Sequence, residues 1–600
     1  MLNLENPLIV QSDRTLLLDV HAPLAEECRE SLIPFAELVR SPEHLHTYQL
    51  SPLSLWNAVA AGISGDSIAK TLEKFSRYEI PQSVILWIQE TAARFGKLRM
   101  VSAPTKTIER DGNSFTEEFI YLVSSSPFVY KELCSQPSTK KLLVPAEYEE
   151  VCGDNSVSPE EKKYCFVLPL TERGTVKQTL LQLGWPVKDD VPLVDGDFLD
   201  VSLKEKTLSG KDFVVRSYQK EAAHALVGNK SAGSGFGTIV LPCGAGKTIV
   251  GMQIMALLKT NTLIVTTNIS AVHQWIDELV DKTNLCREQI AEYTGENKTV
   301  KNVTVATYQI LTWRPEKDGP YPHFSLFRQN NWGLIIYDEV HMLPAPVFRV
   351  VAELQAVRRV GLTATLVRED GCEGYVFSLV GPKRYDVPWK ELERNHWIAS
   401  AECVEVRLAL DSEKELEYAV APQRQKHKLA SVNPAKIEVV LALVKKFSQD
   451  KILVIGQYID QLSELSKLLS VPIITGKTPN SERDSLYADF RNGKIRVLVV
   501  SKVANFAIDL PDASMAIQVS GTFGSRQEEA QRLGRILRPK DRTSRFFTLI
   551  TRNTVEEDFG SNRQKFLAEQ GYSYRIIRYT DESSLEELDS PLALECGKTL

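Results

Sequence analysis

A short segment, CGAGKT at residues 243–248, has the residue types that bind phosphate groups. It stands between a predicted strand, TIVLP, and a predicted helix, IVGMQIMALL. Glycines let backbone N–H groups surround phosphate oxygens, and the start of a helix adds a favourable dipole. In this interpretation Lys247 reaches the β and γ phosphates of a nucleotide, and the Thr248 hydroxyl holds Mg²⁺. The full consensus of a nucleotide-binding phosphate loop has glycine at the position of Leu241 in this chain. A plain glycine turn before a helix is therefore the alternative interpretation.

Two adjacent carboxylates, Asp338 and Glu339, end the apolar run GLIIY and lie 91 residues after Lys247. An apolar run that stops at two acidic residues is typical of a buried strand whose carboxyl end faces a ligand. Asp338 is then placed to bind Mg²⁺ through water, and Glu339 to polarise an attacking water. A lone Asp-Glu pair is more often a solvated turn, but the phosphate-binding segment favours the catalytic interpretation.

Three arginines, Arg532, Arg535 and Arg538, follow one another at intervals of three in QEEAQRLGRILRP, residues 527–539. This spacing gathers them on one helix face. Facing a phosphate cleft, Arg535 and Arg538 would stabilise charge on a phosphoryl group during its transfer. A solvated basic face is the alternative, although Gly534 permits close approach of another segment.

Other polar residues fit around such a nucleotide site. Gln219 has an amide suited to the edge of adenine, and the hydroxyls of Thr363 and Thr365 in GLTAT could couple the site to a second ligand. Hydroxyls and amides at the predicted strand ends suit a sugar–phosphate backbone, without reading its sequence. The predicted ATP-binding residues are Arg216, Gln219, Cys243, Gly244, Ala245, Gly246, Lys247, Thr248 and Gln531. The predicted contacts to a nucleic-acid backbone are Thr267, Gln274, Trp275, Thr307, Thr475 and Ser501.

Two series of short β-branched runs, each alternating with helical segments, must position these residues. They predict two doubly wound parallel-sheet lobes of the α/β class, at residues 206–395 and 396–580. Residues 1–205 form an amino-terminal α+β region, in which 53–98 has the apolar spacing of three short helices broken at Gly62, Gly65 and Pro81. From position 581 to the end there are six acidic residues and one lysine, so we expect a mobile tail.

Composition excludes several other classes of protein. The 600 residues have a net charge of -6, which excludes a polybasic, histone-like binder but permits a local basic groove. No apolar stretch reaches the length of a membrane span, and no secretory signal begins the chain. The nine cysteines contain no CxxC pair, so neither a zinc knuckle nor an iron–sulfur cluster is expected. These features favour a cytoplasmic location.

The motifs together resemble those of superfamily 2 helicases, and most closely the XPB family in its bacterial and archaeal form. The similar segments are LPCGAGKT, DEVH, GLTATLVRED, FLAEQGYSYRI and residues 498–540, and LHTYQLSPLSLWNAVAAG is similar to the family's amino-terminal domain. The resemblance implies ATP-dependent 3′-to-5′ translocation on DNA and duplex unwinding, a role in DNA repair, and a nuclease or repair partner.

The resemblance also assigns two further segments. Arg368, Glu369 and Asp370 match the family's RED loop, which is implicated in opening the duplex. Residues 419–436, with Arg424, Lys426 and Lys428, correspond to the family's basic thumb, and residues 1–205 to its damage-recognition part. Two other functions stay open: translocation on double-stranded DNA without strand separation, and a non-catalytic interaction protein that binds ATP.

Overall fold

The computed structural model divides into two compact units. One comprises Met1–Glu37, Thr47–Leu241 and Gly246–Val387, and the other comprises Leu38–His46, Pro242–Ala245 and Pro388–Leu600. The structure describes residues 5–589 except 41–43, 105, 111–112, 118, 151–156, 229–233, 243, 317–320, 328, 344–346, 348–356, 365–372, 388, 502–512, 522–532, 534–542, 570–571 and 573.

The amino-terminal 205 residues contain a four-stranded sheet, a five-stranded sheet and a separate two-stranded pair (Lys106–Arg110 with Asn113–Glu117), where the sequence predicted a single α+β region. The first sheet has the strand order β1-β2-β4-β3 and precedes the three predicted helices, which are confirmed. The hydroxyls of Ser51 and Ser64 cap the first two helices by accepting hydrogen bonds from the N–H groups of Ser54 and Ser67. These elements are β1 (Leu8–Val10), β2 (Thr15–Asp19), α1 (Ala25–Leu32), β3 (Glu37–Arg40), β4 (Leu45–Gln49), α2 (Pro52–Ala60), α3 (Gly65–Phe75) and α4 (Gln82–Ala92).

The second sheet has the order β11-β5-β8-β10-β9 and is mostly antiparallel. Leu98, Leu122 and Phe166 lie in its core, which also includes Leu180 of α7. The elements are β5 (Leu98–Ser102), β6 (Lys106–Arg110), β7 (Asn113–Glu117), β8 (Phe119–Ser124), α5 (Pro127–Ser135), α6 (Pro137–Lys140), β9 (Val144–Ala146), β10 (Cys165–Pro169), α7 (Arg173–Gln182) and β11 (Val187–Asp189).

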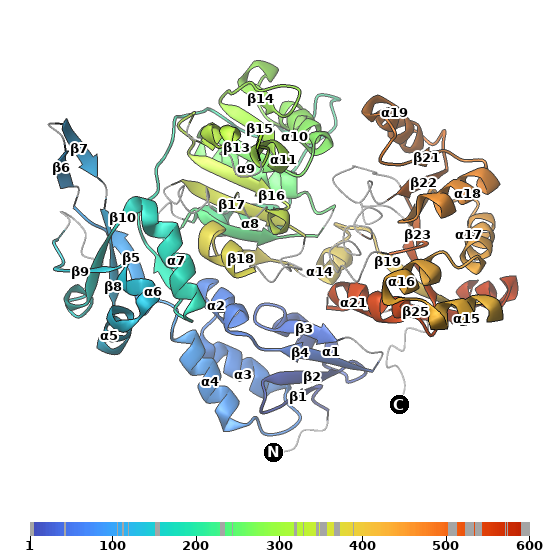
Figure 1. Cartoon of the computed structure of the whole chain (residues 1–600), viewed down its shortest axis with the longest axis horizontal. Helices are drawn as coiled ribbons and strands as arrows, with labels where there is room; N and C mark the ends of the chain where they lie inside the picture. Colours follow the sequence, from blue (N-terminus) through green and yellow to red (C-terminus); the bar gives the residue numbers. More distant parts are fainter. Residues whose placement is uncertain are drawn as a thin grey trace. The chain divides into compact units, whose positions relative to one another are not determined.

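Lobe 1 is a seven-stranded parallel sheet of order β14-β15-β13-β16-β17-β12-β18, with helices packed around it (Figure 1). Strands β12, β13 and β15 are buried along their whole length, as predicted for the β-branched runs. The elements are α8 (Ser217–Val227), β12 (Phe236–Val240), α9 (Lys247–Leu258), β13 (Thr262–Thr266), α10 (Ile269–Lys282), β14 (Ile290–Tyr293), β15 (Val303–Thr307), α11 (Tyr308–Leu311), β16 (Leu334–Asp338), β17 (Arg358–Thr363), α13 (Glu373–Tyr375), η6 (Val376–Val380) and β18 (Lys383–Asp386).

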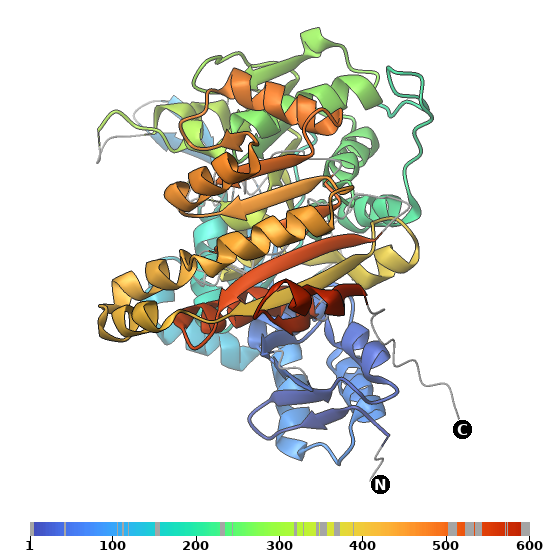
Figure 2. The same cartoon turned by 90° about the vertical axis from the view of Figure 1, so that its right-hand side faces the viewer.

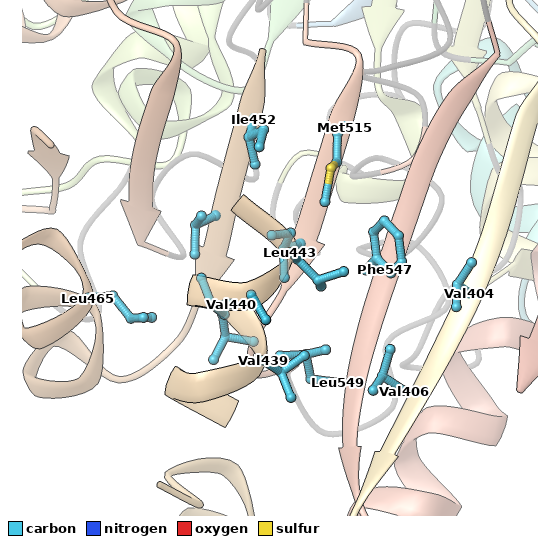
Figure 3. Close-up of a cluster of buried hydrophobic side chains, with 14 of the residues drawn as sticks. Val404, Val406, Val439, Val440, Leu443, Ile452, Leu465, Met515, Phe547 and Leu549 are labelled. Carbon is cyan, nitrogen blue, oxygen red and sulfur yellow. The ribbon is translucent and has the colours of Figure 1, made fainter. Parts of the chain in front are cut away.

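Lobe 2 is a second seven-stranded parallel sheet, of order β21-β22-β20-β23-β24-β19-β25. Figure 2 shows its helices, in orange, in front of its strands. Val439, Val440 and Leu443 of α17 point toward Phe547 and its neighbours on the sheet, which closes the core (Figure 3). The elements are α14 (Trp389–Arg394), β19 (Ala401–Leu408), α15 (Ser412–Val420), α16 (Gln423–Ser431), α17 (Ala435–Lys446), β20 (Ile452–Gly456), α18 (Ile459–Leu469), β21 (Ile473–Ile474), α19 (Asn480–Arg491), β22 (Val497–Ser501), β23 (Met515–Gln518), β24 (Ser544–Thr551), α21 (Val555–Glu569) and β25 (Tyr574–Arg578).

The two parallel sheets confirm the predicted fold class, whereas residues 582–589, the described part of the expected mobile tail, pack on lobe 2. Residues Glu582–Asp589 form the 3₁₀-helical segment η8, and Leu585 is buried in the core of lobe 2. Burial of this leucine holds the first part of the acidic segment on the lobe. Within the described part of the chain, no helix combines the length and apolar character needed to cross a bilayer.

Candidate functional site

The predicted phosphate-binding segment connects β12 to α9 and depends on two glycines. Gly244 and Gly246 have φ angles of 81° and 79°, in the left-handed region that glycine adopts without strain. A Cβ atom at position 246 would lie 2.6 Å from Nε2 of Gln219, so a larger residue would displace that amide as well as strain the backbone. Lys247 and Thr248 are the first residues of α9, whose N-terminus is therefore directed as a phosphate site requires.

Gln219 lies beside this loop, at the start of α8. Its side chain is 2% exposed, and its Oε1 accepts a hydrogen bond of 2.9 Å from the backbone N–H of Arg216. Its Nε2 donates to the hydroxyl of Tyr218 at 3.4 Å. The structure thus brings Arg216 and Gln219 to the nucleotide loop, and their contact with adenine stays a prediction.

Lys247 and Glu339 form an ion pair across the predicted site. Nζ of Lys247 lies 2.5 Å from Oε1 of Glu339, and both side chains are mostly buried. Glu339 follows β16 directly and has a φ of 49°, a left-handed conformation that costs a non-glycine residue energy. The two residues whose roles were predicted independently are therefore in direct contact.

Asp338, the last residue of β16, is fixed by several hydrogen bonds. Nε1 of Trp275 donates to its Oδ2 at 2.9 Å, Oγ1 of Thr266 lies 3.4 Å from the same oxygen, and the backbone N–H of Glu339 donates to its Oδ1 at 3.0 Å. The hydroxyl of Tyr308 donates to its backbone carbonyl at 2.9 Å. These contacts hold the carboxylate in one orientation.

Trp275 is placed differently from its prediction as a contact to a nucleic-acid backbone. It is 2% exposed, and its ring packs against α9, where a Cβ at position 251 would lie 2.7 Å from Cη2 of the indole. Gly251 therefore provides the space for the ring. The sequence pattern missed this role because residues 266–275 were interpreted together as one strand-end segment, whereas Trp275 faces inward from the second turn of α10.

The two carboxyls of the site differ electrostatically. Burial raises the pKa of Asp338 above its ordinary value, and the negative charge of Glu339 raises it further. Burial also opposes ionisation of Glu339, but Lys247, with a contribution from His341, leaves the pKa of Glu339 below its ordinary value. Glu339 is thus ionised opposite Lys247, while a further cation would favour the ionised form of Asp338.

The residues present fit Mg²⁺, which prefers oxygen ligands and binds through one or two protein groups together with phosphates and water. Asp338 offers a buried, oriented carboxylate, and Thr248 a hydroxyl at the second residue of α9. Among the described residues there is no cluster of three or more His, Cys, Asp or Glu side chains suited to a metal ion. Mg²⁺ held by Asp338 and Thr248 would accordingly depend on phosphate oxygens for its remaining ligands.

Thr363, one of the predicted coupling residues, is linked to the carboxylate segment through His341. Oγ1 of Thr363 lies 2.7 Å from Nδ1 of His341, and both residues are buried. Oε2 of Glu339 lies 3.4 Å from the same nitrogen. The sequence pattern assigned no role to His341, although its position two residues after Glu339 in DEVH was the available signal.

Comparisons with known proteins agree on one family. The chain is 48% identical over 579 residues to the DNA 3'-5' helicase XPB of Kineococcus radiotolerans, covering 96% of this chain and 97% of that protein. It is 47% identical over 580 residues to the Mycobacterium tuberculosis protein of the same name, covering 96% and 98%. The chain belongs to the XPB helicase family.

More distant XPB proteins and family models match as well. Identity is 32% over 588 residues, covering 96% of this chain and 82% of the relative, to the "General transcription and DNA repair factor IIH helicase/translocase subunit XPB" of Antonospora locustae. The ERCC3/RAD25/XPB C-terminal helicase model matches residues 392–593, and the type III restriction enzyme res-subunit model matches 212–368. A model named helicase conserved C-terminal domain matches residues 8–147.

The remaining predicted DNA contacts of this XPB-family chain lie at strand ends, except Gln274, which lies in α10. In lobe 1, Thr267 follows β13 and Thr307 ends the adjacent β15, so they share one sheet edge. Thr267 and Gln274 are half-buried, whereas Thr307 is 4% exposed and its hydroxyl caps α11 by accepting from the N–H of Ile310 at 3.2 Å. Thr307 is thus occupied as a helix cap in this structure.

In lobe 2, Thr475 follows β21 and Ser501 ends the adjacent β22. The hydroxyl of Thr475 accepts from the backbone N–H of Lys477 at 3.2 Å, while the Ser501 hydroxyl is buried and makes no hydrogen bond to the described residues. The predicted residues Cys243, Thr365, Arg368, Glu369, Asp370, Gln531, Arg532, Arg535 and Arg538, and the side chain of Arg424, lie outside the described residues.

Proposed function

We propose that this XPB-family protein is an ATP-dependent 3′-to-5′ DNA helicase that couples ATP hydrolysis to translocation and duplex unwinding. The observation that carries the proposal is the Lys247–Glu339 ion pair at the end of a glycine loop, beside the oriented carboxylate of Asp338. This arrangement contains the groups that a phosphoryl-transfer site needs: a phosphate-binding lysine, a carboxylate for a metal and a carboxylate for water.

The chain's own residues have distinct roles in hydrolysis. Lys247 must leave Glu339 to bind the β and γ phosphates, and this exchange frees the Glu339 carboxylate to orient and polarise the attacking water. Mg²⁺, held by Asp338 and Thr248, would supply charge stabilisation for the phosphate oxygens. Arg535 and Arg538 would stabilise the charge that develops on the transferred phosphoryl group.

The contact between His341 and Thr363 offers a route from ATP to DNA. Movement of the DEVH segment on hydrolysis changes a hydrogen bond to the end of β17, from which the predicted coupling segment continues. We propose that Thr363 and Thr365 pass this change to Arg368, Glu369 and Asp370 at the point where the strands part. The backbone contacts Thr267, Gln274, Thr475 and Ser501 would hold one strand during each step.

A double-stranded DNA translocase that does not separate strands is a second candidate, and the Antonospora locustae relative is itself named helicase/translocase. That relative's name also includes DNA repair, which we propose as the cellular role here. We also propose that a nuclease or another repair protein acts together with this chain.

Two assays test the proposal. ATP hydrolysis with and without single-stranded DNA should show stimulation by DNA, with Lys247→Ala as the inactive control. Strand displacement should occur on a duplex with a 3′ tail and not on one with a 5′ tail. Triplex displacement without strand displacement would select the translocase, and binding of ATP without hydrolysis would select a non-catalytic interaction protein.

A further inference from the structure

A fully buried ion pair in lobe 2 involves none of the residues of the nucleotide site. Nζ of Lys436 in α17 lies 2.8 Å from Oε2 of Glu556 in α21, and the two side chains are 0% and 2% exposed. The Glu556 carboxylate also accepts hydrogen bonds of 3.0 Å from the hydroxyl of Ser431 and from the backbone N–H of Thr551. Apolar residues of similar volume usually stabilise a fold at least as well as a buried ion pair, because burying two charges is costly. Stability alone therefore does not account for this pair.

Lys436 also holds the chain where it leaves β23. Its Nζ donates a hydrogen bond of 2.9 Å to the backbone carbonyl of Val519, the first residue after that strand. The hydroxyl of the next residue, Ser520, accepts a hydrogen bond of 2.8 Å from the backbone N–H of Gln457, which follows β20. Two consecutive residues at the end of β23 are thus fixed by groups from two other elements.

Gly521, the next residue, is in contact with a third element. Arg563 of α21 is 1% exposed, and a Cβ atom at position 521 would lie 2.4 Å from its Cζ. The guanidinium thus lies directly against the backbone of Gly521, and a larger residue there would displace it. Since the Lys436–Glu556 pair joins α17 to α21, these side chains act as one unit on the end of the strand. We call Lys436, Glu556 and Arg563 the β23 anchor.

The β23 anchor lies at the edge of the sheet where this class of fold binds ligands. β23 runs parallel to β20 and β24, so the carboxyl ends of these strands meet at one edge. Open parallel α/β sheets bind their ligands outside the carboxyl ends of their strands. From Gly521 the chain continues toward Arg532, Arg535 and Arg538, which lie outside the described residues. The anchor therefore fixes the point from which the arginine-bearing segment leaves the sheet.

A fixed starting point matters for a group that acts on a phosphoryl transition state. An error of about 1 Å in the placement of a catalytic group can lower a rate by about 100-fold. We propose that the β23 anchor positions Arg535 and Arg538, and that it raises the rate of ATP hydrolysis without contacting ATP. This inference rests on the proposed function, in which the two arginines stabilise the transferred phosphoryl group. The alternative is that the buried pair only joins α17 to α21.

The first measurement is steady-state ATP hydrolysis by the full chain at saturating single-stranded DNA. Lys436→Met removes the donor to Val519 at nearly constant side-chain length, and kcat should fall by about 10–100-fold. KM for ATP should change by less than about twofold, because the anchor acts only through groups that contact the transition state. Lys445→Met, which removes a 77% exposed lysine of the same helix, should leave both constants unchanged. A Lys436→Met variant with the parent's kcat overturns the proposal.

A double variant separates positioning from attachment of the two helices to each other. Lys436→Met combined with Glu556→Leu replaces the ion pair by apolar residues and should retain the parent's melting temperature. The carbonyl of Val519 still lacks its donor, so kcat should stay as low as in Lys436→Met alone. Recovery of both the melting temperature and kcat in the double variant would show a structural role and overturn the proposal.

Binding of ADP with aluminium fluoride, which resembles the transferring phosphoryl group, shows whether the anchor acts through the arginines. Lys436→Met should weaken this binding by the same factor as kcat and leave the binding of ADP alone unchanged. In a chain that already carries Arg535→Ala and Arg538→Ala, adding Lys436→Met should cause no further loss. A further loss of equal size would show that Lys436 acts on another group, and it would overturn the proposal.

Gly521→Ala keeps the proposal testable if the variants of the buried pair do not fold. The added methyl group displaces the guanidinium of Arg563 while the ion pair stays intact, so kcat should fall with KM nearly constant. A kcat equal to that of the parent overturns the proposal here as well. A parent chain that hydrolyses no ATP would instead overturn the proposed function, so the two can fail separately.

Discussion

The indole N–H of Trp275 donates to the carboxylate of Asp338 at 2.9 Å, across 63 residues of sequence. Trp275 belongs to the helix that follows β13, and Asp338 ends β16, the strand beside β13 in the sheet. The bond gives Asp338 an orientation that its own strand does not impose. It also offsets part of the burial that disfavours the charged carboxyl.

Replacing Trp275 by phenylalanine should therefore raise the Mg²⁺ concentration that ATP hydrolysis requires. The variant keeps an aromatic ring in the space beside Gly251 but loses the hydrogen bond to Asp338. Loss of a residue that orients a metal ligand typically costs about 10–100-fold in metal affinity or activity. The measurement is the ATPase rate as a function of Mg²⁺ concentration, with Trp313→Phe, a half-exposed tryptophan of the same lobe, as the control. An unchanged Mg²⁺ dependence would remove Trp275 from the site.

The Lys247–Glu339 pair separates into two functions when each partner is changed. Lys247→Ala should abolish hydrolysis and weaken ATP binding, because the lysine contacts phosphate. Glu339→Gln should abolish hydrolysis but retain ATP binding, because the carboxylate acts on water. Equilibrium binding of a fluorescent ATP analogue, measured beside turnover, distinguishes the two. Normal turnover by Glu339→Gln would show that another group activates the water.

Changing Arg368, Glu369 and Asp370 together to alanine should leave DNA-stimulated ATP hydrolysis largely intact, since Lys247 and Glu339 are untouched. Strand separation should fall sharply, because a motor without its wedge still steps. The paired measurement is ATPase rate and unwinding of a 3′-tailed duplex on the same preparation. Unwinding at the parent's rate would instead favour the translocase.

Arg173 and Lys177 of α7 contact Asp189 at 2.8 Å and 2.9 Å, and all three side chains are buried. This charge cluster predicts opposite effects of two neighbouring substitutions. Asp189→Asn leaves Arg173 and Lys177 without their carboxylate and should cost about 3–5 kcal/mol. For the amino-terminal region, residues 1–205, this free-energy loss corresponds to a fall of about 10 °C in melting temperature. Lys177→Met should have little effect or be stabilising, since Arg173 still neutralises Asp189. Calorimetry of both variants checks this, and similar losses in the two would contradict it.

The pH dependence of Lys177→Met has a defined sign. The folded-state pKa of Lys177, about 7, lies below its ordinary value of 10.5. Between these values the unfolded chain binds a proton that the folded chain does not, so this lysine makes stability rise with pH. The advantage of Lys177→Met over the parent should accordingly shrink between pH 7 and pH 9.

Local sequence patterns predicted the parts of the site that consist of short contiguous segments. The glycine loop, Lys247 and the Asp-Glu pair follow from residue type and short spacing, and the three helices in residues 53–98 follow from apolar periodicity. Contacts that depend on the packing of distant elements were not predictable. The partners of Trp275 and His341 are set by the order of strands in the sheet, which a run of β-branched residues does not reveal.

The three sheets within residues 1–205 were also not separable from the sequence, since their strands are short and mix polar with apolar residues. The acidic composition after position 580 predicted a mobile tail, although Leu585 is buried in the core of lobe 2 and Leu588 packs against it. Charge composition describes the surface of a segment, and a few apolar side chains on its other face can still pack on a lobe.

The tight contact between Gly251 and the ring of Trp275 makes these two positions exchangeable only together. A larger residue at position 251 would displace the indole and with it the donor to Asp338. A smaller ring at position 275 would leave unfilled space beside Gly251. Gly251 thus lets α9 approach the Trp275 ring of α10 closely. Gly251→Ala, a change expected to strengthen an isolated helix, would here disturb the orientation of Asp338.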